Sequence, residues 1–205
     1  MSLIKLKNNA LDNLTSFEGS ASLGDMVLVS SATASSSASI EFDLGSYKEY
    51  KFFFVNIHAG TSAVDFTFQT SIDGGSTYGV TATSTAFRAY HQEDGINSGL
   101  GYITDDDLSQ STSFQILSPV GGATALGTDN DSNLNGTLTI YNPSSNTFVK
   151  HFIARTAFFD RFAPTSAVDG YIAGYFNNTN DLTNIKFQMS SGNIDDGKIL
   201  MFGLN

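Results

Sequence analysis

The residues best spaced to bind a ligand lie in the acidic stretch 129–136. Asp129, Asp131 and Asn133 occupy alternate positions, so three side-chain oxygens can turn toward one centre, as the hard cation Ca²⁺ prefers. An EF-type loop requires Gly where this sequence has Leu134, and no Glu follows at the closing position. The stretch is therefore a calcium candidate, and the competing interpretation is a polar loop between two strands. No other cofactor is predicted.

The chain offers no arrangement of residues that is typical of an enzyme. Its histidines, His58, His91 and His151, are far apart in the sequence, and core packing or solvent exposure explains them more simply than metal binding. No Gly-x-Ser-x-Gly elbow, P-loop or dinucleotide-binding motif occurs. Glycoside hydrolysis needs two carboxylates in a dry pocket, and nothing in the spacing of the aspartates selects such a pair. We therefore predict no enzymatic activity.

Tyrosine side chains could also stack on sugar rings, as in β-sandwich modules that bind glycans. Tyr90, Tyr102, Tyr171 and Tyr175 are the candidates, with Tyr90 and Tyr102 foremost. The loop-forming stretches 91–107 and 118–133 would contact the host. Packing in a core explains most tyrosines more simply. A glycan-binding tip is therefore the alternative hypothesis for function.

The overall charge excludes one large class of partner. The chain of 205 residues has 10 basic and 20 acidic side chains, for a net charge of −10, and no Lys/Arg cluster. Such a chain repels phosphate backbones, so nucleic-acid binding is not expected. No apolar run is long enough for a membrane span, and the first residues lack the apolar core of a signal peptide, so we expect synthesis in the cytoplasm. Cysteine is absent, which excludes disulfides and thiolate sites.

The period of the hydrophobic pattern predicts the fold class. In residues 64–72, Val64, Phe66, Phe68 and Ile72 alternate with polar residues, which is typical of a strand with one buried face. Asp73-Gly74-Gly75 then provides residues that tolerate positive φ at a turn. About nine to eleven such strands occur along the chain, without helical periodicity. We predict an all-β, two-sheet antiparallel sandwich of the jelly-roll type.

Two pairs of consecutive strands are predicted to form hairpins. The first joins residues 49–59 to residues 64–72, and the second joins residues 136–142 to residues 147–159 across the turn Asn142–Asn146. The strand 49–59 is apolar on both faces, with Phe53, Val55 and Ile57 on one and Phe52 and Phe54 on the other. Such a strand is either central in its sheet or meets another subunit with its outer face, so Phe52 and Phe54 are candidate assembly residues.

The first 25 residues are predicted to be an arm and linker that precede a domain of residues 26–205. An isolated segment this short cannot bury its apolar side chains alone, so it is either a frayed terminus or an arm that packs on a neighbouring subunit. The assembly residues proposed in this arm are Leu3, Ile4, Leu6, Leu11 and Leu14.

Three segments point to a family. They are Gly197-Lys-Ile-Leu-Met-Phe-Gly-Leu204, Ser71-Ile-Asp-Gly-Gly-Ser-Thr-Tyr78, and the turn leading into an aromatic strand at residues 42–52. Together they resemble segments of tailed-bacteriophage virion proteins, although Met201-Phe202 stands where Leu-Tyr is more usual. The resemblance implies a jelly-roll structural protein of the virion, a homotrimer that decorates a capsid or forms part of a fibre or spike. Its expected partners are copies of itself, other virion proteins and, under the alternative hypothesis, a host surface glycan.

Overall fold

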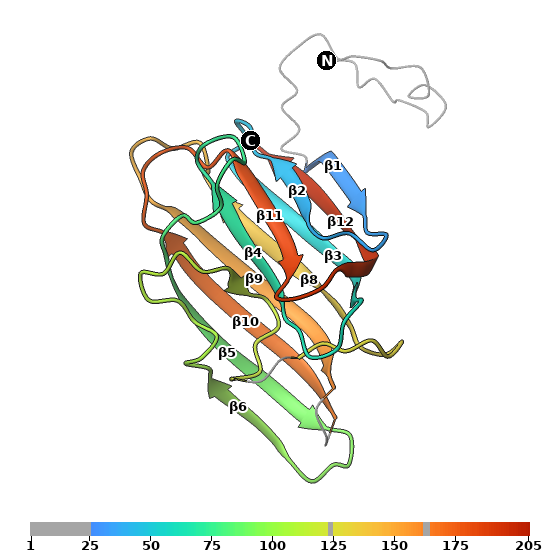
Figure 1. Cartoon of the computed structure of the whole chain (residues 1–205). Helices are drawn as coiled ribbons and strands as arrows, with labels where there is room; N and C mark the ends of the chain where they lie inside the picture. The colour runs from blue at the N-terminus through green and yellow to red at the C-terminus, as the bar shows by residue number, and fades with distance from the viewer. Residues whose placement is uncertain (1–25, 123–124, 162–164) are drawn as a thin grey trace, which may run out of the picture.

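The described part of the chain is built from β-strands alone (Figure 1). The computed structural model describes residues 26–122, 125–161 and 165–205. Within these ranges twelve strands form two antiparallel sheets that face each other, and no helix occurs. The prediction of an all-β, two-sheet antiparallel sandwich is confirmed.

The large sheet contains eight strands in the order β1-β12-β3-β8-β9-β10-β5-β6, and the small sheet contains four in the order β2-β11-β4-β7. Their bounds are β1 (Val27–Thr33), β2 (Ile40–Asp43), β3 (Glu49–Ala59), β4 (Phe66–Ser71), β5 (Ala82–Gln92), β6 (Ser98–Tyr102), β7 (Gln115–Ile116), β8 (Asn133–Tyr141), β9 (Lys150–Asp160), β10 (Ser166–Phe176), β11 (Asn184–Met189) and β12 (Ile194–Leu204).

Strand β9 illustrates how the sequence produces these elements. Phe152, Ala154 and Phe158 point inward and are buried, whereas Ile153 and Arg155 between them are exposed. Successive side chains on a pleated strand point to opposite faces, so this alternation covers the core with one face only. The other face of β9 is left to solvent or to a partner.

The core between the sheets is dominated by phenylalanine. The Phe187 ring of β11 has its centroid 5.3 Å from that of Phe52 and 5.4 Å from that of Phe54, both on β3 of the opposite sheet. Phe66 of β4 stacks on Phe187 at 5.9 Å. Aromatic pairs at these distances contribute about 0.5–1.5 kcal/mol each beyond their burial. These rings therefore join the two sheets.

Loops cover the inner face of the large sheet where the small sheet ends. The Thr156 hydroxyl on β9 donates to the Leu117 carbonyl at 2.7 Å, and the Ile103 amide donates to the Ala86 carbonyl on β5 at 2.8 Å. Leu117 and Leu126, which belong to these loops, are fully buried against the sheet. The segment between β6 and β8 thus completes the core, and among the described residues the outer face of the large sheet has no protein layer over it.

The structure places β3 inside the large sheet, as one of the two alternatives predicted, and corrects the face of Ile57 and the assembly role of Phe52 and Phe54. Phe52 and Phe54 are buried in the core of their own chain, and Phe53 lies on the outer face. A bulge at Asn56, with φ of 51°, shifts the alternation so that Ile57 returns to the core. Phe52 and Phe54 are therefore core residues rather than surface residues available for assembly.

A second irregularity, on β12, fits against this bulge. Gly197 has a φ of 115°, and a Cβ at this position would lie 2.6 Å from the Asn56 carbonyl oxygen and 2.8 Å from the Ile57 Cα. A side chain fits neither the dihedral angle nor the space. The two strands can therefore approach here only because residue 197 is glycine.

One of the two predicted hairpins is confirmed and the other is wrong. Strands β8 and β9 pair in register on either side of the turn near Asn142. Strands β3 and β4, however, lie in different sheets and do not pair, because β3 pairs with β8 and β12 while β4 pairs with β7 and β11. Gly74 and Gly75 adopt positive φ, as predicted, in the turn that leads from β4 toward β5.

The sequence analysis missed β6, which brings the count to twelve. Gly99 and Gly101 make this segment resemble a loop, but Tyr90 of β5 pairs with Gly99. A Cβ on Gly99 would lie 3.0 Å from the Tyr90 ring, so the glycine provides room for that ring. The proposed assembly residues Leu3, Ile4, Leu6, Leu11 and Leu14 lie outside the described residues, and their role remains a prediction.

Candidate functional site

The candidate site is the outer face of the large sheet. One row of side chains crosses all eight strands on this face. In register from β1 to β6, its members are Ser31, Leu200, Phe53, Thr137, Arg155, Tyr171, Phe87 and Tyr102. Phe87 is 38% exposed and Tyr102 is 53% exposed. Five of these eight side chains are apolar or aromatic, and they share the uncovered face with Ser31, Thr137 and Arg155.

Rings and charges are stacked against one another in the middle of this row. The Phe87 and Tyr171 rings lie parallel, with an interplanar angle of 3° and centroids 4.8 Å apart. Arg155 lies over Tyr171, with its guanidinium carbon 5.0 Å from the ring centroid. Because β10 lies between β5 and β9, these two neighbours contact opposite faces of the Tyr171 ring. Neither face of that ring is free.

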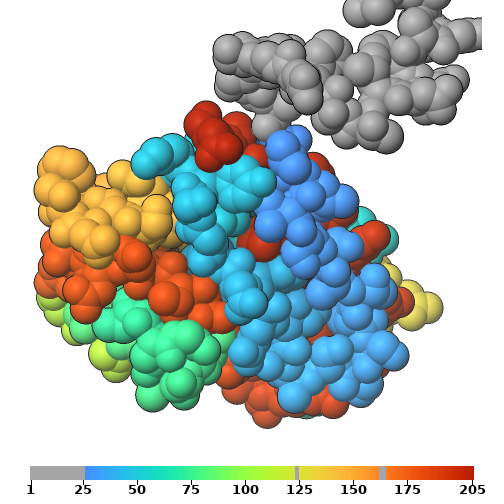
Figure 2. Space-filling model, turned by 90° about the horizontal axis from the view of Figure 1, so that it is seen from above, coloured from blue at the N-terminus to red at the C-terminus, as the bar shows by residue number. Residues whose placement is uncertain are grey.

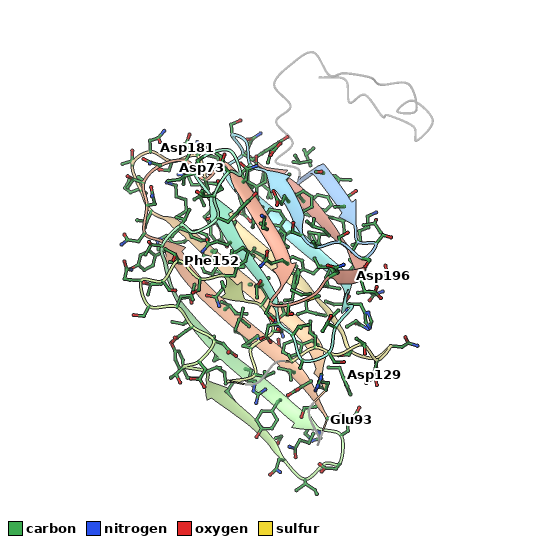
Figure 3. All side chains as sticks on the ribbon, in the orientation of Figure 1. Asp73, Glu93, Asp129, Phe152, Asp181 and Asp196 are labelled. Atoms are coloured by element: carbon green, nitrogen blue, oxygen red, sulfur yellow. The ribbon has the colours of Figure 1, made fainter. Side chains whose placement is uncertain are left out.

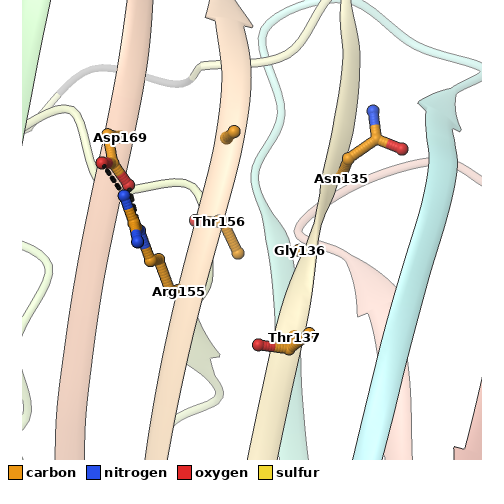
Figure 4. A pocket seen from close by; sticks show the side chains of 7 residues that line it. Asn135, Gly136, Thr137, Arg155, Thr156 and Asp169 are labelled. Carbon is orange, nitrogen blue, oxygen red and sulfur yellow. Dashed lines mark hydrogen bonds and ion pairs between the residues drawn. The ribbon is translucent and has the colours of Figure 1, made fainter.

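Arg155 also forms a paired hydrogen bond with Asp169 (Figure 4). Its Nε donates to Asp169 Oδ1 at 3.0 Å and its Nη2 donates to Oδ2 at 2.7 Å. The Tyr171 hydroxyl donates to the same Oδ2 at 3.1 Å. The bonds from Arg155 hold the pKa of Asp169 below its usual value, and Asp169 raises the pKa of Arg155. A pair that stays ionised near neutral pH is a poor general acid or base and a good fixed anchor.

A shallow hollow lies beside this pair. Its volume is about 460 Å³, and it is lined by residues of β8, β9 and β10, among them Asn135, Thr137 and Ala157. Gly136, Thr156, Arg155 and Asp169 complete the lining (Figure 4). The hollow could receive a side chain from a partner molecule.

The half of the face near β12 is more apolar. Phe53 and Phe202 meet edge to face there, and Lys51 lies over the Phe53 ring at 5.5 Å. Val55 is 42% exposed and Ile153 is 53% exposed on the same face. Large apolar side chains concentrated on one uncovered surface are typical of protein interaction sites.

Comparison of the chain with protein-family models, with curated proteins and with solved structures found no match. No helix in the described ranges is long and apolar enough to cross a membrane. The function is therefore inferred from the geometry of the described residues.

The calcium candidates lie together at one end of the sandwich. Figure 3 shows Asp129 at the end opposite to Asp73 and Asp181. Asp129 and Asp131 are exposed, and the Asn133 side-chain oxygen accepts a hydrogen bond from the Asn135 amide at 2.9 Å. In the described parts of the chain, no three His, Asp or Glu side chains are grouped so that they could hold a metal ion. The calcium site remains a prediction, and the positions of these three residues give it no further support.

The glycan candidates Tyr90 and Tyr102 lie on opposite faces of the large sheet. Tyr90 faces inward, is partly buried, and lies 5.0 Å from the guanidinium carbon of Arg88. Tyr102 faces outward at the β6 edge, and its hydroxyl donates to Asp107. The structure does not bring these two rings together into one binding surface.

Three buried aspartates lie away from the outer face. Asp65 is 5% exposed, and its Oδ1 accepts hydrogen bonds from the Ser118 hydroxyl at 3.2 Å and the Ala125 amide at 3.1 Å. Burial raises the pKa of Asp65 to about 6, and the nearby Asp106 and Asp160 charges act in the same direction. Asp106 accepts from the amides of Val120 and Gly121, so these carboxylates organise loop backbone. Asp106 lines a hollow of about 300 Å³ together with Asp105 and Asp107, and neither Asp65 nor Asp160 lines it.

Three residues of the outer face, Phe87, Arg155 and Phe202, were not among the predicted site residues. A usable signal was present in β9, where Ile153 is apolar at a position out of phase with Phe152 and Ala154. The row itself could not be found in this way, because its members are brought into register only by strand pairing.

Proposed function

We propose that this protein is a non-enzymatic structural component of a bacteriophage virion, which assembles as a homo-oligomer through the outer face of the large sheet. The observation that carries the proposal is the apolar and aromatic row on that uncovered face. The residue pairs already described there are fixed by stacking and charge pairing. A rigid, partly apolar surface loses little conformational entropy when it binds another rigid surface.

The size of the face is adequate for such a contact. Eight strands about 4.8 Å apart give a width of roughly 35 Å. A standard interface buries about 800 Å² on each partner. The longest strands have 11 residues and span roughly 37 Å, so the whole face has a projected area of roughly 1,300 Å², enough for a stable contact between copies.

We further propose that the sandwich is a jelly roll with two added hairpin-like pairs. When β5, β6, β9 and β10 are set aside, the first strand pairs with the last, β1 with β12, and the next ones inward follow the same rule, β2 with β11, β3 with β8 and β4 with β7. This nested pairing between two sheets supports a jelly-roll wrap. The four added strands widen the large sheet and enlarge its outer face.

Light scattering on variants of the full chain tests the assembly. We expect the unmodified chain to have a mass that is a multiple of 21.9 kDa, three times that value if it is the trimer that the resemblance implies. Ile153→Lys and Phe87→Lys place charge on the outer face and should shift the mass toward the monomer. Asn130→Lys, in an exposed loop, is the matched control and should leave the mass unchanged. A monomeric unmodified chain would refute the proposal.

Antibody labelling of intact particles tests the location. We expect the chain to be part of the purified virion, as a decoration, fibre or spike component. Detection only outside the particles would refute the virion role while leaving assembly untouched.

The alternative function, a glycan-binding tip, has less support from the geometry. Sugar stacking needs a free aromatic face. The Tyr171 ring is covered on both faces, and Tyr90 is partly buried. Tyr102 is the more exposed of the two predicted contact residues. Binding on a glycan array that is lost in Tyr102→Ala would favour this alternative.

A further inference from the structure

The two sheets have four edges, and three of them carry features that discourage pairing with another chain. Strand β2 is short and carries Glu41 and Asp43, and Lys186 lies 2.8 Å from the Glu41 carboxylate. Strand β7 consists of only two residues. Strand β6 is short, contains two glycines, and lies in the sequence between the acidic groups Glu93-Asp94 and Asp105–Asp107. Short strands and charged side chains are the usual means of protecting a sheet edge.

Strand β1 lacks this protection. It is seven residues long, and residues 26–39 contain no charged side chain and no proline. Val27, Leu28 and Val29 are 48%, 52% and 40% exposed. The described strands pair with β1 only on its β12 side, so its other edge has no strand partner among them. In Figure 2 the blue segment that begins with β1 lies at the surface on one flank of the molecule.

Charge indicates which partner this edge accepts. The chain has a net charge of −10, so two copies repel each other over most of their surface. Contact between copies is therefore least opposed at a strand that carries no charge itself, and β1 is such a strand, while the nearest carboxylates, Glu41 and Asp43 of β2, line a hollow beside Val29 and Ser30. The irregularity in β1 lies between Leu28 and Ser30, which leaves Ser30–Thr33 in regular register for pairing.

We propose that β1 pairs with β1 of a second copy, antiparallel and around a two-fold axis. An axis perpendicular to the sheet near the middle of β1 makes the two strands antiparallel and keeps both outer faces on the same side. The contact is closed, since each copy provides the same strand. Joining β1 to β6 of another copy would instead produce an open chain of copies. This inference rests on the proposed self-assembly and names a second contact, separate from the outer face.

Cysteine scanning on the full chain tests the contact, because the chain contains no cysteine of its own. Each residue from Val27 to Thr33 is replaced singly by Cys, and covalent dimers are counted after mild oxidation. Around a two-fold axis, a residue on the axis faces its own mate, and a residue two positions away is roughly 14 Å from its mate along the strands. A disulfide needs Cβ atoms about 4 Å apart. We therefore expect dimers at one or two neighbouring positions and a steep fall on both sides.

Two exposed positions serve as matched controls. Asn130→Cys lies in an exposed loop, and Leu100→Cys on β6 is 73% exposed. We expect no dimer at Asn130→Cys and no crosslink between Leu100→Cys and a β1 Cys, and we expect Val27→Lys to abolish the dimer when it is added to the Cys variant that crosslinks best. Equal crosslinking at all exposed positions would show random collision and overturn the proposal. Crosslinks between a β1 Cys chain and a Leu100→Cys chain would show pairing of β1 with β6 and would also overturn it.

The outcome separates this contact from the proposed function. If no β1 position crosslinks while light scattering still shows an oligomer that Ile153→Lys disrupts, the two-fold contact is wrong and assembly through the face stands. If no β1 position crosslinks because residues 1–25 of the same chain cover the edge, a disulfide between a β1 Cys and a second Cys in that segment should form within monomers. That result also overturns the two-fold contact. A monomer without any crosslink refutes both proposals.

Discussion

The rings of Phe53 and Phe202 meet edge to face on the outer surface of the large sheet, with their centroids 5.4 Å apart and their planes at 79°. They lie on neighbouring strands, β3 and β12, at diagonal positions. One residue away, Phe52 points in the opposite direction and packs against Phe187 in the core. Two adjacent phenylalanines of one strand thus belong to different surfaces, one intramolecular and one available to a partner.

This difference predicts unequal costs for two neighbouring substitutions. Phe52→Ala removes a fully buried ring and should lower the free energy of unfolding by about 3–5 kcal/mol. Phe53→Ala removes a half-buried ring and its contact with Phe202 and should cost about 1–2 kcal/mol. Urea unfolding of both variants measures the difference. Equal losses would contradict the corrected assignment of the β3 faces.

Asp65 should make stability depend on pH. Its pKa in the folded chain is about 6, above the ordinary value of 3.8, because burial disfavours the charge. The folded chain therefore binds this proton more tightly than the unfolded chain, so the stabilisation is fully present below pH 3.8 and is lost as pH rises through 6. The difference of about two pKa units corresponds to roughly 3 kcal/mol.

Asp65→Asn removes this titration, so its stability relative to the unmodified chain should improve between pH 4 and pH 7 by up to that amount. Guanidinium unfolding at both pH values gives the comparison. Asp131→Asn, at an exposed position, is the control and should show little relative change. A relative stability of Asp65→Asn that does not vary with pH would disprove the role of the buried carboxyl.

Lys150 should be important for the loop between β10 and β11. It is fully buried, and its Nζ donates to the carbonyl oxygens of Asn178 at 3.2 Å and Asn180 at 2.5 Å. Burial lowers the pKa of Lys150. Lys150→Met keeps the aliphatic stem and leaves two carbonyls without their donor, so it should cost about 1–3 kcal/mol.

Hydrogen exchange should locate that loss in residues 177–183, with faster exchange than in the unmodified chain. Lys48→Met, at an exposed lysine, should change stability by less than about 0.5 kcal/mol. Uniformly faster exchange across both sheets, without a local maximum, would argue against a local role for Lys150.

Gly197 should tolerate no side chain. Gly197→Ala forces a Cβ to within 2.6 Å of the Asn56 carbonyl oxygen at a φ of 115°, so we expect a loss of about 2–4 kcal/mol. Gly101→Ala is the matched control, since a Cβ there has no atom within 4 Å, and it should change stability by less than about 1 kcal/mol. Thermal unfolding of the two variants compares them. A stable Gly197→Ala chain would show that the two bulges are not held in close contact.

The sequence by itself determined most of the strands. Alternation at period two is local, since it depends only on the pleat of one segment, and it correctly identified strands at residues 64–72 and 147–159 and the positive φ of Gly74 and Gly75. Strand β6 escaped because its glycines conceal the pattern, and their purpose becomes visible only when Tyr90 lies over Gly99.

The tertiary structure alone decided which strands pair and which faces remain open. Strands β3 and β4 follow each other in the chain yet lie in different sheets, because pairing partners come from segments far away in the sequence. The bulge at Asn56 reverses the phase of β3, and it exists only where Gly197 of β12 fits against it. In the same way, Phe53, Arg155, Tyr171 and Phe87 form one row only through the register of four strand pairs. The local alternation of residues shows that a strand has two faces. Contacts between segments far apart in the sequence decide which of the two faces packs against the core.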